Sequence, residues 1–489
     1  MAIQTSAATA RSIEANGLNV IGEAERHGTP RSLFWPWFAS NISVLSISYG
    51  SFVLGFGLSI WQALIATVIG VIVSFLLCGF VSLAGKRGSA PTLVLSRAPF
   101  GVNGNRVPSF LSWLLTVGWE TVLVVLATLA TATVFGRLGW GGGTLTKLIA
   151  LLVVAGITVV AGVFGFRLIM KLQTWVTIAT AVLTVGYMAL GAGHIHWSAV
   201  SAMPNGGAPA VIGATVMLAT ALGLGWTNCA ADYSRYLPRR SSSAGVVGWT
   251  TFAASLGPVV LIIFGLFLAG SDPGLSKAVG ADPIGALTQI LPTWFLVPFA
   301  IVAILGLIGG TVMDIYSSGL SLLSLGLRAP RYVAALIDGC LMTIGAVMVV
   351  FFADNFVGPF QGFLITVGVP IATWTGIFLG DLALRRRDYS DADLYDAGGR
   401  YDSVRPLPLL LLVLGTAVGW GLVTNTYAGW LSWQGYLLTP FGFGGRQGNW
   451  AGANLGVLAA LLIGFIGILF TRAQVRRQET LTPVIAPTR

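Results

Sequence analysis

The stretch VIGATVMLATALGLGWTNCAADYSRYLP, residues 211–238, decides the fold of this chain. It begins as an apolar run, is interrupted by the glycine-containing motif Gly223 to Asn228, and turns polar from Asp232 onward. Non-helical backbone at membrane depth is tolerated only where protein or a water-filled cavity satisfies its polar groups. The stretch therefore predicts a broken transmembrane helix, the kind of element that marks the substrate site in secondary transporters. Transport is the leading functional hypothesis.

The composition places the whole chain in a membrane. Of its 489 residues, 55% are hydrophobic and only 9% are charged, whereas soluble domains carry about 25% charged residues. Apolar stretches of about 20 residues, the length that crosses a hydrocarbon core of about 30 Å, occur twelve times. They cover residues 34–58, 61–84, 108–135, 145–164, 174–192, 211–227, 249–269, 294–317, 332–352, 360–383, 407–426 and 451–471. The sequence predicts an all-α, multi-pass membrane protein with twelve transmembrane helices.

Charge placement gives the orientation. If the N-terminus is cytoplasmic, 23 of the 27 lysine and arginine residues lie in inner segments, and the outer loops keep Arg137, Lys147, Lys277 and Arg446. A missed helix would invert every later loop, so the positive-inside rule favours an even count. We expect both termini in the cytoplasm and the chain in the cell inner (plasma) membrane. The net charge of +10 then faces anionic lipid, so the bilayer is a predicted partner and nucleic acid is not.

The first ten spans divide into two halves, residues 34–192 and 209–384, which we predict to form an inverted repeat. The first span carries a polar stretch, Ser43 to Ser51, that includes Ser46 and Tyr49. Spans one and six then hold the two irregular helices at corresponding positions, which indicates a binding site between the repeats. Ser46 and Tyr49 are candidate substrate ligands, with polar helix packing as the alternative. The other predicted regions are a cytoplasmic N-terminal segment 1–33, a cytoplasmic loop 385–406, two extra helices 407–471 and a cytoplasmic tail 472–489.

Two acids lie at membrane depth, Glu120 in the third span and Asp314 in the eighth. A carboxyl group in a span costs about 2.5–3.5 kcal/mol on insertion scales and usually faces a cavity or pathway. We predict that both bind substrate and carry a coupling proton; the alternative is a structural acid bonded across helices. Trp119 lies beside Glu120 and Trp226 lies in the helix-six motif, so both are predicted to line the pocket. The alternative for each tryptophan is a place in the interfacial aromatic belt.

Several ordered motifs resemble the nucleobase–cation symporter family, in its purine-cytosine permease branch. They are Glu25 to Pro30, Ser96 to Gly101, Gly118-Trp119, Asp232 to Pro238 and Tyr316 to Leu320. The resemblance extends from about Gly17 to the Arg400-Tyr401 loop, with weaker likeness beyond. It implies a leucine-transporter-type fold with five plus five helices in inverted repeat and two extra helices. It also implies import of a nucleobase or related small heterocycle together with H⁺ or Na⁺.

The resemblance further implies site residues. In the family, an aromatic residue on helix three and the broken part of helix six sandwich the ring, and polar side chains on helices three and eight bind its edge. Carried over, Trp119 is the helix-three stacking partner. Counting back from Asp232 places the helix-six part of the pocket at Gly223 to Gly225, with Trp226 adjacent.

The chain departs from the family pattern at three places. Leu123 stands where the branch commonly has an amide, and Asp314 stands where an asparagine is usual. Sodium-coupled members carry adjacent hydroxyls earlier on helix eight, where residues 306–311 read GLIGGT. We therefore predict H⁺, carried by Glu120 and Asp314, as the coupling cation, with Na⁺ as the alternative.

Other classes of function fit less well. A channel favours a continuous polar stripe or a ring of charges, and two isolated acids with broken helices argue against one. No metal-ligand cluster, Walker loop or nucleophile-base arrangement is present in the sequence, so we predict no enzyme activity, no catalytic residue, no metal and no cofactor beyond the coupling cation. No obligate protein partner is evident. Within transport, the alternatives are a heterocycle of the allantoin, hydantoin, thiamine or pyridoxine type, or a small cationic heterocycle attracted by the two acids.

Overall fold

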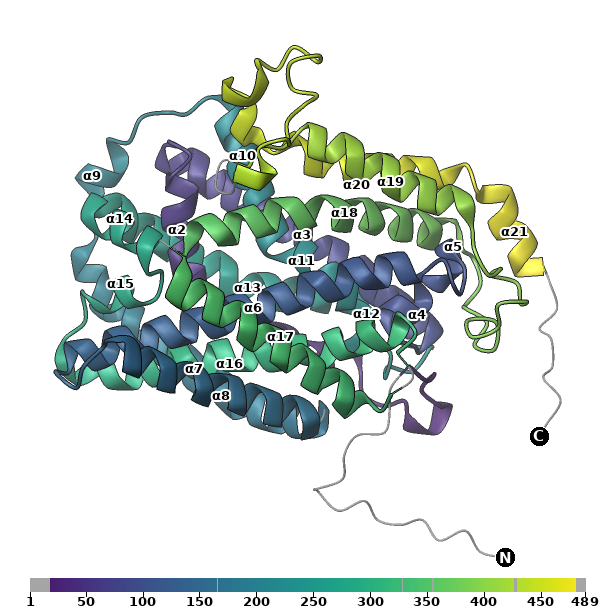
Figure 1. Ribbon diagram of the computed structural model, residues 1–489, viewed down its shortest axis with the longest axis horizontal. Coiled ribbons are helices and arrows are strands. Elements are labelled where there is room, and N and C mark those ends of the chain that lie inside the picture. Colours follow the sequence, from purple (N-terminus) through teal and green to yellow (C-terminus); the bar gives the residue numbers. More distant parts are fainter. Residues whose placement is uncertain (1–17, 165, 328, 354–355, 426–428, 481–489) are drawn as a thin grey trace, which may run out of the picture.

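The computed structural model describes residues 18–480, with gaps at residues 165, 328, 354–355 and 426–428. Within these residues every regular element is a helix (Figure 1). The predicted N-terminal segment 1–33 is therefore described only from residue 18 onward. The predicted tail 472–489 is described only as far as residue 480, and the remainder of both lies outside the described residues.

Nine helices of the described chain are long and apolar enough to cross a membrane, or up to eleven if each of two bent pairs is one span. The long helices are α3 (Ile60–Gly88), α6 (Arg106–Arg137), α7 (Thr144–Phe164), α8 (Phe166–Gly191), α13 (Ser243–Ser271), α16 (Thr293–Ser324), α17 (Arg331–Phe352) and α18 (Val357–Leu384). The shorter ones are α1 (Phe34–Asn41), α2 (Leu45–Leu54), α10 (Ala208–Ala221), α11 (Gly223–Trp226), α12 (Ala230–Ser234), α19 (Pro406–Gly421), α20 (Leu455–Leu469) and α21 (Arg472–Thr480). Helix α19 occupies the place of the eleventh predicted span with only 16 residues. The count of twelve stays a prediction.

The first predicted span, residues 34–58, is broken. Helices α1 and α2 meet at an angle of 65°, because Ile42 leaves the helical region with φ −82° and ψ 87°. The Ser43 hydroxyl then accepts a hydrogen bond from the Leu45 N–H at 3.3 Å, which satisfies one of the free donors at the start of α2. The break therefore falls at the beginning of the polar stretch Ser43 to Ser51.

The sixth span is also broken, one residue before the glycine motif. Helix α10 ends at Ala221, and Leu222 adopts φ −115° and ψ −106° before α11 begins at Gly223. The Gly223 N–H donates to the Ser74 hydroxyl at 3.2 Å, and its carbonyl accepts from the Cys78 thiol at 2.7 Å. Side chains of α3 thus satisfy the interrupted backbone, as the membrane interior requires.

Corresponding helices of the two predicted halves pack on one another. Helix α3 lies along α13, α6 along α16, and α7 against α17. The broken helices pack on the first pair, with α2 on α13 and α10 on α3. Helices α19 and α20 pack on α18 and form a layer at the top of Figure 1. This pairing positions the two helix breaks in the middle of the molecule, while the boundaries of the two halves remain a prediction.

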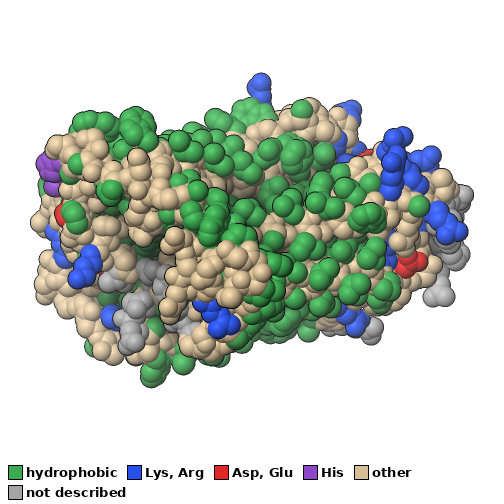
Figure 2. Space-filling model, turned by 90° about the horizontal axis from the view of Figure 1, so that it is seen from above, with side chains coloured by type: hydrophobic (Ala, Val, Ile, Leu, Met, Phe, Trp, Pro, Cys, Tyr) green, Lys and Arg blue, Asp and Glu red, His purple; other side chains and the backbone are tan. Residues whose placement is uncertain are grey.

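The surface has an apolar middle and a basic end. In Figure 2, hydrophobic side chains cover much of the middle of the visible face, and Lys and Arg gather at the end that carries α21. Many large apolar side chains are exposed on the molecule, including Leu145, Trp175 and Val413 at 69%, 72% and 65%. Such a band is unfavourable in water and stable in lipid.

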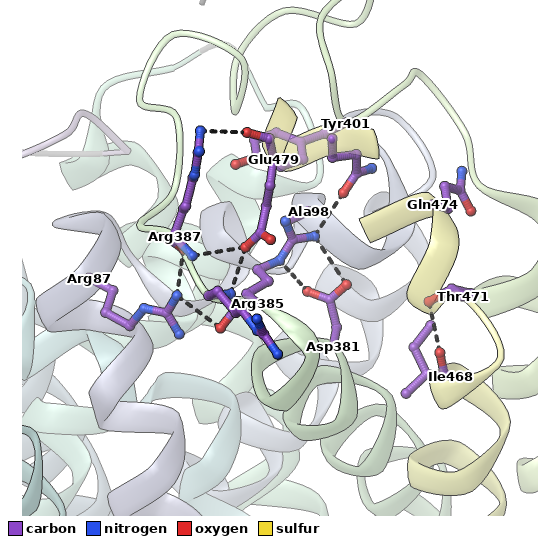
Figure 3. Close-up of polar contacts among 12 residues, drawn as sticks. Arg87, Ala98, Asp381, Arg385, Arg387, Tyr401, Ile468, Thr471, Gln474 and Glu479 are labelled. Carbon is purple, nitrogen blue, oxygen red and sulfur yellow. Dashed lines mark hydrogen bonds and ion pairs between the residues drawn. The ribbon is translucent and has the colours of Figure 1, made fainter. Parts of the chain in front are cut away.

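The loop after α18 and helix α21 are fastened together at the basic end (Figure 3). Arg385 binds the Asp381 carboxylate through Nε and Nη2 at 2.6 and 3.0 Å, and it also donates to Gln478 at 3.0 Å. Glu479 accepts hydrogen bonds from the backbone N–H groups of the two residues after Arg385, at 2.6 and 2.8 Å. The α21 helix is therefore held to this loop by side-chain and backbone hydrogen bonds.

Candidate functional site

A pocket lies where the two helix breaks meet α6 and α16, and its volume is about 60 Å³. Residues from the first break (Ser40, Asn41, Ser43, Leu45, Ser46, Tyr49), α6 (Trp119, Leu123), the second break (Ala221, Leu222, Gly225, Trp226) and α16 (Gly306, Gly310, Asp314) line it. Interrupted helices leave backbone groups free to bind a ligand near the middle of the bilayer. This pocket is our candidate substrate site.

A larger cavity of about 480 Å³ lies near the end of the molecule opposite α21. It is formed by the ends of α6, α7 and α17 together with Asp282, and Lys147 lies at its wall. No helix break of either half contributes to its lining. Size alone would favour it, but the convergence of the two breaks favours the smaller central pocket.

Six of the predicted site residues surround the central pocket. They are Ser46, Tyr49, Trp119, Gly225, Trp226 and Asp314. The structure places the two others, Glu120 and Gly223, outside its lining. A Cβ atom on Gly223 would lie 2.2 Å from the backbone carbon of Ser74, so this glycine serves the close contact between α11 and α3. Glu120 is fully buried on α6.

The two tryptophans line the pocket from different elements, α6 and α11, and each packs against another aromatic ring. Trp119 packs edge-on against Phe360, with ring centroids 5.5 Å apart, and Trp226 packs edge-on against Trp37 at 6.0 Å. A Cβ atom on Gly225 would lie 3.3 Å from Trp119 Nε1, so a side chain there would press on the indole. The arrangement presents two indole rings to one small space, which suits a planar ring.

Polar groups complete the pocket wall. The Tyr49 hydroxyl is buried and has no hydrogen-bond partner in the part of the chain that the structure describes, so it can bond a ligand that enters the pocket. Asp314 is 5% exposed and follows Gly306 and Gly310 at intervals of four residues on α16. Residues at this spacing share one helix face, so the glycines leave space beside the carboxyl group. Two polar side chains can thus meet the edge of a bound ring.

The Asp232 motif lies outside the pocket lining and fixes α12, the last part of the sixth span. Asp232 Oδ1 accepts from the Thr92 N–H and hydroxyl, both at 2.8 Å, and its Oδ2 accepts from the Ser317 hydroxyl at 3.0 Å. Arg235 donates to the Tyr316 hydroxyl at 2.9 Å. These contacts join α12 to α16 and to the short helix Thr92–Leu95, so the motif is structural in this conformation.

The described side chains form neither a metal cluster nor a pair of hydroxyls in the motif 306–311. The described residues contain no group of three or more His, Cys, Asp or Glu that could hold a metal ion. The one hydroxyl in the motif 306–311, on Thr311, donates to the Leu307 carbonyl at 2.9 Å within its own helix. A sodium ion at this part of α16 would depend on backbone carbonyls.

Sequence reasoning missed some pocket residues. Ser40 and Asn41 were detectable, because they are polar residues inside an apolar span just before the Ser43 to Ser51 stretch. Phe360, which supports Trp119, carried no signal because it is one of 26 phenylalanines. Only packing distinguishes it from the others.

Comparisons with known proteins agree with the motifs. A family model described as permease for cytosine/purines, uracil, thiamine, allantoin matches residues 20–439. A putative purine-cytosine permease of Bacillus subtilis is 22% identical over 420 residues, covering 82% of this chain and 86% of that protein. The cytosine permease of Escherichia coli (strain K12) is 27% identical over 377 residues, covering 75% of this chain and 80% of that protein.

A solved structure supports the fold. Mhp1, a nucleobase-cation-symport-1 family transporter in a closed conformation with bromovinylhydantoin bound, matches with a TM-score of 0.69 and 21% identity. The match covers 96% of this chain and 100% of that chain. The predicted all-α fold of the leucine-transporter type is confirmed. Since the family model spans most of its length, the chain belongs to the family of permeases for cytosine/purines, uracil, thiamine and allantoin, and it is a multi-pass membrane transporter and not an enzyme.

Proposed function

We propose that this protein imports a nucleobase or a related small heterocycle across the cell inner (plasma) membrane by proton symport and alternating access. The observation that supports this most is the convergence of Trp119 and Trp226 with Tyr49 and Asp314 around one pocket between two broken helices. Indole rings hold a planar ring by stacking. A hydroxyl and a carboxyl group supply hydrogen bonds to its ring nitrogens and exocyclic groups.

A proton is the coupling cation in this proposal. Asp314 places one carboxyl group in the pocket wall, and the motif 306–311 offers one hydroxyl, which is already bonded within α16. A carboxyl group that faces the pocket can take up a proton from one side of the membrane and release it on the other as access alternates. Na⁺ coupling is the alternative.

The substrate class has one alternative that a specific residue favours. Asp314 stands where the family commonly has an asparagine, and a carboxylate prefers a cationic partner in a dry site. The aspartate would therefore strengthen the binding of a heterocycle that carries a positive charge, of the thiamine or pyridoxine type. Neutral heterocycles of the allantoin or hydantoin type are the alternative substrates for a transporter of the same fold.

Uptake into transport-deficient cells tests the proposal. The panel contains cytosine, adenine, uracil, allantoin, hydantoin, thiamine and pyridoxine, each measured with and without Na⁺ and with an acid or neutral exterior. We expect saturable uptake of one chemical class, stimulated by an acid exterior. Uptake of none of these compounds by correctly inserted protein would contradict the proposed substrate class. Uptake that stays the same when the transmembrane proton gradient is abolished or reversed would contradict proton symport.

A further inference from the structure

A pair of acidic side chains lies outside the pocket lining, between α6, α16 and α17. Glu120 of α6 and Asp338 of α17 are both fully buried. The Asp338 carboxylate accepts two hydrogen bonds, from Trp113 Nε1 to Oδ1 at 2.6 Å and from the Ser318 hydroxyl to Oδ2 at 2.9 Å. Neither acid lines the central pocket. The four side chains form what we call the Glu120–Asp338 site.

Glu120 differs from Asp338 in its contacts. Both of its carboxyl oxygens are buried, and neither has a hydrogen-bond partner among the described residues. The polar groups that face it are Ser318 and Asp314 of α16 and Asp338 of α17. From α7 and α18, which also pack against α6, no titratable group acts on it among the described residues. Three acids thus share this region, and among the side chains that the structure describes no basic group compensates Glu120.

Physical chemistry assigns different protonation states to the two acids. An ionised carboxylate without a donor or counter-ion is very costly to bury, so Glu120 is neutral in this conformation. Asp338 has one donor for each oxygen and can stay ionised. Ser318 owns a single hydroxyl proton. Asp338 Oδ2 is its nearer acceptor, at 2.9 Å, and the Ile315 carbonyl lies at 3.3 Å, so this proton cannot serve Glu120 at the same time. Two adjacent carboxyl groups that share limited donors hold one proton between them.

We infer that Glu120 and Asp338 form a proton-binding site separate from the substrate pocket, in which one exchangeable proton resides on Glu120 and Ser318 is the donor that both acids compete for. When Ser318 turns its hydroxyl from Asp338 to Glu120, the proton moves from the Glu120 carboxyl to the Asp338 carboxylate. The pair keeps one proton and one negative charge throughout. A role in transport rests on the proposed proton symport: if that proposal holds, the Glu120–Asp338 pair receives the transported proton.

The helix geometry links this site to the pocket and to the basic end. Asp314 and Ser318 are four residues apart on α16, and Trp113 and Glu120 are seven apart on α6, so each pair shares a helix face. Glu120 lies 14 residues after the first residue of α6, which is about 21 Å along the helix axis. Asp338 lies seven residues after the first residue of α17, which is about 10 Å along that axis. Both helices start at the basic end, so the site runs from the pocket wall toward that end.

Infrared spectroscopy of the full-length protein in lipid tests the inference without any heterocycle. A protonated carboxyl group gives a C=O band that shifts in D₂O, and its intensity is followed from acid to alkaline pH. We expect Glu120→Gln to remove part of this band at neutral pH. Asp338→Asn should move the remaining titration toward lower pH by about one unit or more, because a negative neighbour is lost and Ser318 becomes free for Glu120.

The control is Asp391→Asn, which removes a carboxylate paired with Arg239 at the surface and should leave the band and its titration unchanged. An unchanged neutral-pH band in Glu120→Gln would overturn the inference, as would an Asp338→Asn titration that matches the control. Should these variants not fold, Ser318→Ala replaces them: removal of the shared donor must shift the titration, and a wild-type titration overturns the inference. A positive result together with no uptake from the heterocycle panel would leave the proton site standing and refute the proposed substrate.

Discussion

At the scale of single residues, the pocket places ring-stacking and hydrogen-bonding groups at different walls. Trp119 and Trp226 come from α6 and from the second helix break, and Asp314 comes from α16. The Tyr49 hydroxyl is buried and makes no hydrogen bond within the described residues. The effects of changing these residues therefore separate affinity from energy coupling.

Replacing either tryptophan should weaken binding while leaving insertion intact. Stacking contributes about 0.5–1.5 kcal/mol beyond area burial, so Trp119→Ala and Trp226→Ala should each raise the dissociation constant about two- to twelvefold. Calorimetric titration of the purified protein with the transported heterocycle measures this. Trp430→Ala is the control, because Trp430 is 77% exposed outside the spans. Unchanged affinity in Trp119→Ala would show that α6 does not contribute a stacking partner.

Asp314→Asn should uncouple transport. The change removes the titratable group but keeps the shape and the hydrogen-bonding capacity of the side chain. In proteoliposomes we expect substrate exchange to persist and accumulation driven by a pH gradient to be lost. Wild-type uptake that requires Na⁺ and does not respond to the pH gradient would refute proton coupling at Asp314. It would point to a site of backbone carbonyls between the first span (α1 and α2) and α16, near Ser46 to Tyr49.

At the scale of elements, the two broken helices depend on close contact with their neighbours. Helix α11 can lie on α3 only because residue 223 has no side chain. At the basic end, α21 depends on contacts to the loop after α18, shown in Figure 3. Each contact can be changed without touching the pocket lining.

Gly223→Ala should destabilise the protein. Its Cβ would lie 2.2 and 2.3 Å from backbone atoms of residues 74 and 75, and overpacking of this kind costs about 1–3 kcal/mol. We expect a lower thermal unfolding temperature for the protein in detergent. Gly248→Ala on α13 is the matched control, since nothing lies within 4 Å of a Cβ there. Equal unfolding temperatures for the two variants would contradict the close contact between α11 and α3.

Docking of α21 should weaken in acid through Glu479. Partial burial alone would raise the pKa of Glu479, but the N–H groups of Arg387 and Arg386 and the charge of Arg476 outweigh it and lower the pKa. A carboxyl whose pKa is lowered by folding stabilises the docked helix above its unfolded value, near pH 4.3, and loses this contribution as the pH falls through the folded value.

Hydrogen exchange of residues 472–480 should therefore increase as the pH falls below about 4, after correction for the intrinsic rate. In Glu479→Gln this added protection should already be missing at neutral pH, and no further loss should follow on acidification. Acid sensitivity that is the same in both proteins would show that another group controls the docking.

At the scale of the whole molecule, the basic side chains gather at one end and the apolar band surrounds the middle (Figure 2). The positive-inside rule predicts that the end that carries α21 faces the cytoplasm. The larger cavity of about 480 Å³ lies near the opposite end.

Thiol labelling in intact cells tests this orientation. In a Cys340→Ser background, which removes the exposed cysteine, Lys277→Cys should react with a membrane-impermeant reagent from outside. Arg472→Cys should react only after permeabilisation. Labelling of Arg472→Cys in sealed cells would invert the topology and with it the direction of transport.

Residue identities alone were sufficient for the large features. The apolar spans, the basic asymmetry of the loops and the break near Gly223 follow from local composition, because the bilayer demands apolar length and satisfied backbone groups at every position. The irregular first span was also predicted, from the polar stretch Ser43 to Ser51, and the structure bends this span at Ile42, just before that stretch.

Only the tertiary structure decided which side chains meet. Trp119 and Glu120 are neighbours in sequence, but successive residues on an α-helix point about 100° apart, so Trp119 lines the pocket while Glu120 faces Ser318 and Asp338. Gly223 and Gly225 separate in the same way, one against α3 and the other against Trp119. The sequence by itself determined a multi-pass transporter with a broken sixth helix. The rotation of each helix about its axis set the pocket lining and the acidic pair, because that rotation is fixed by packing against helices distant in the chain.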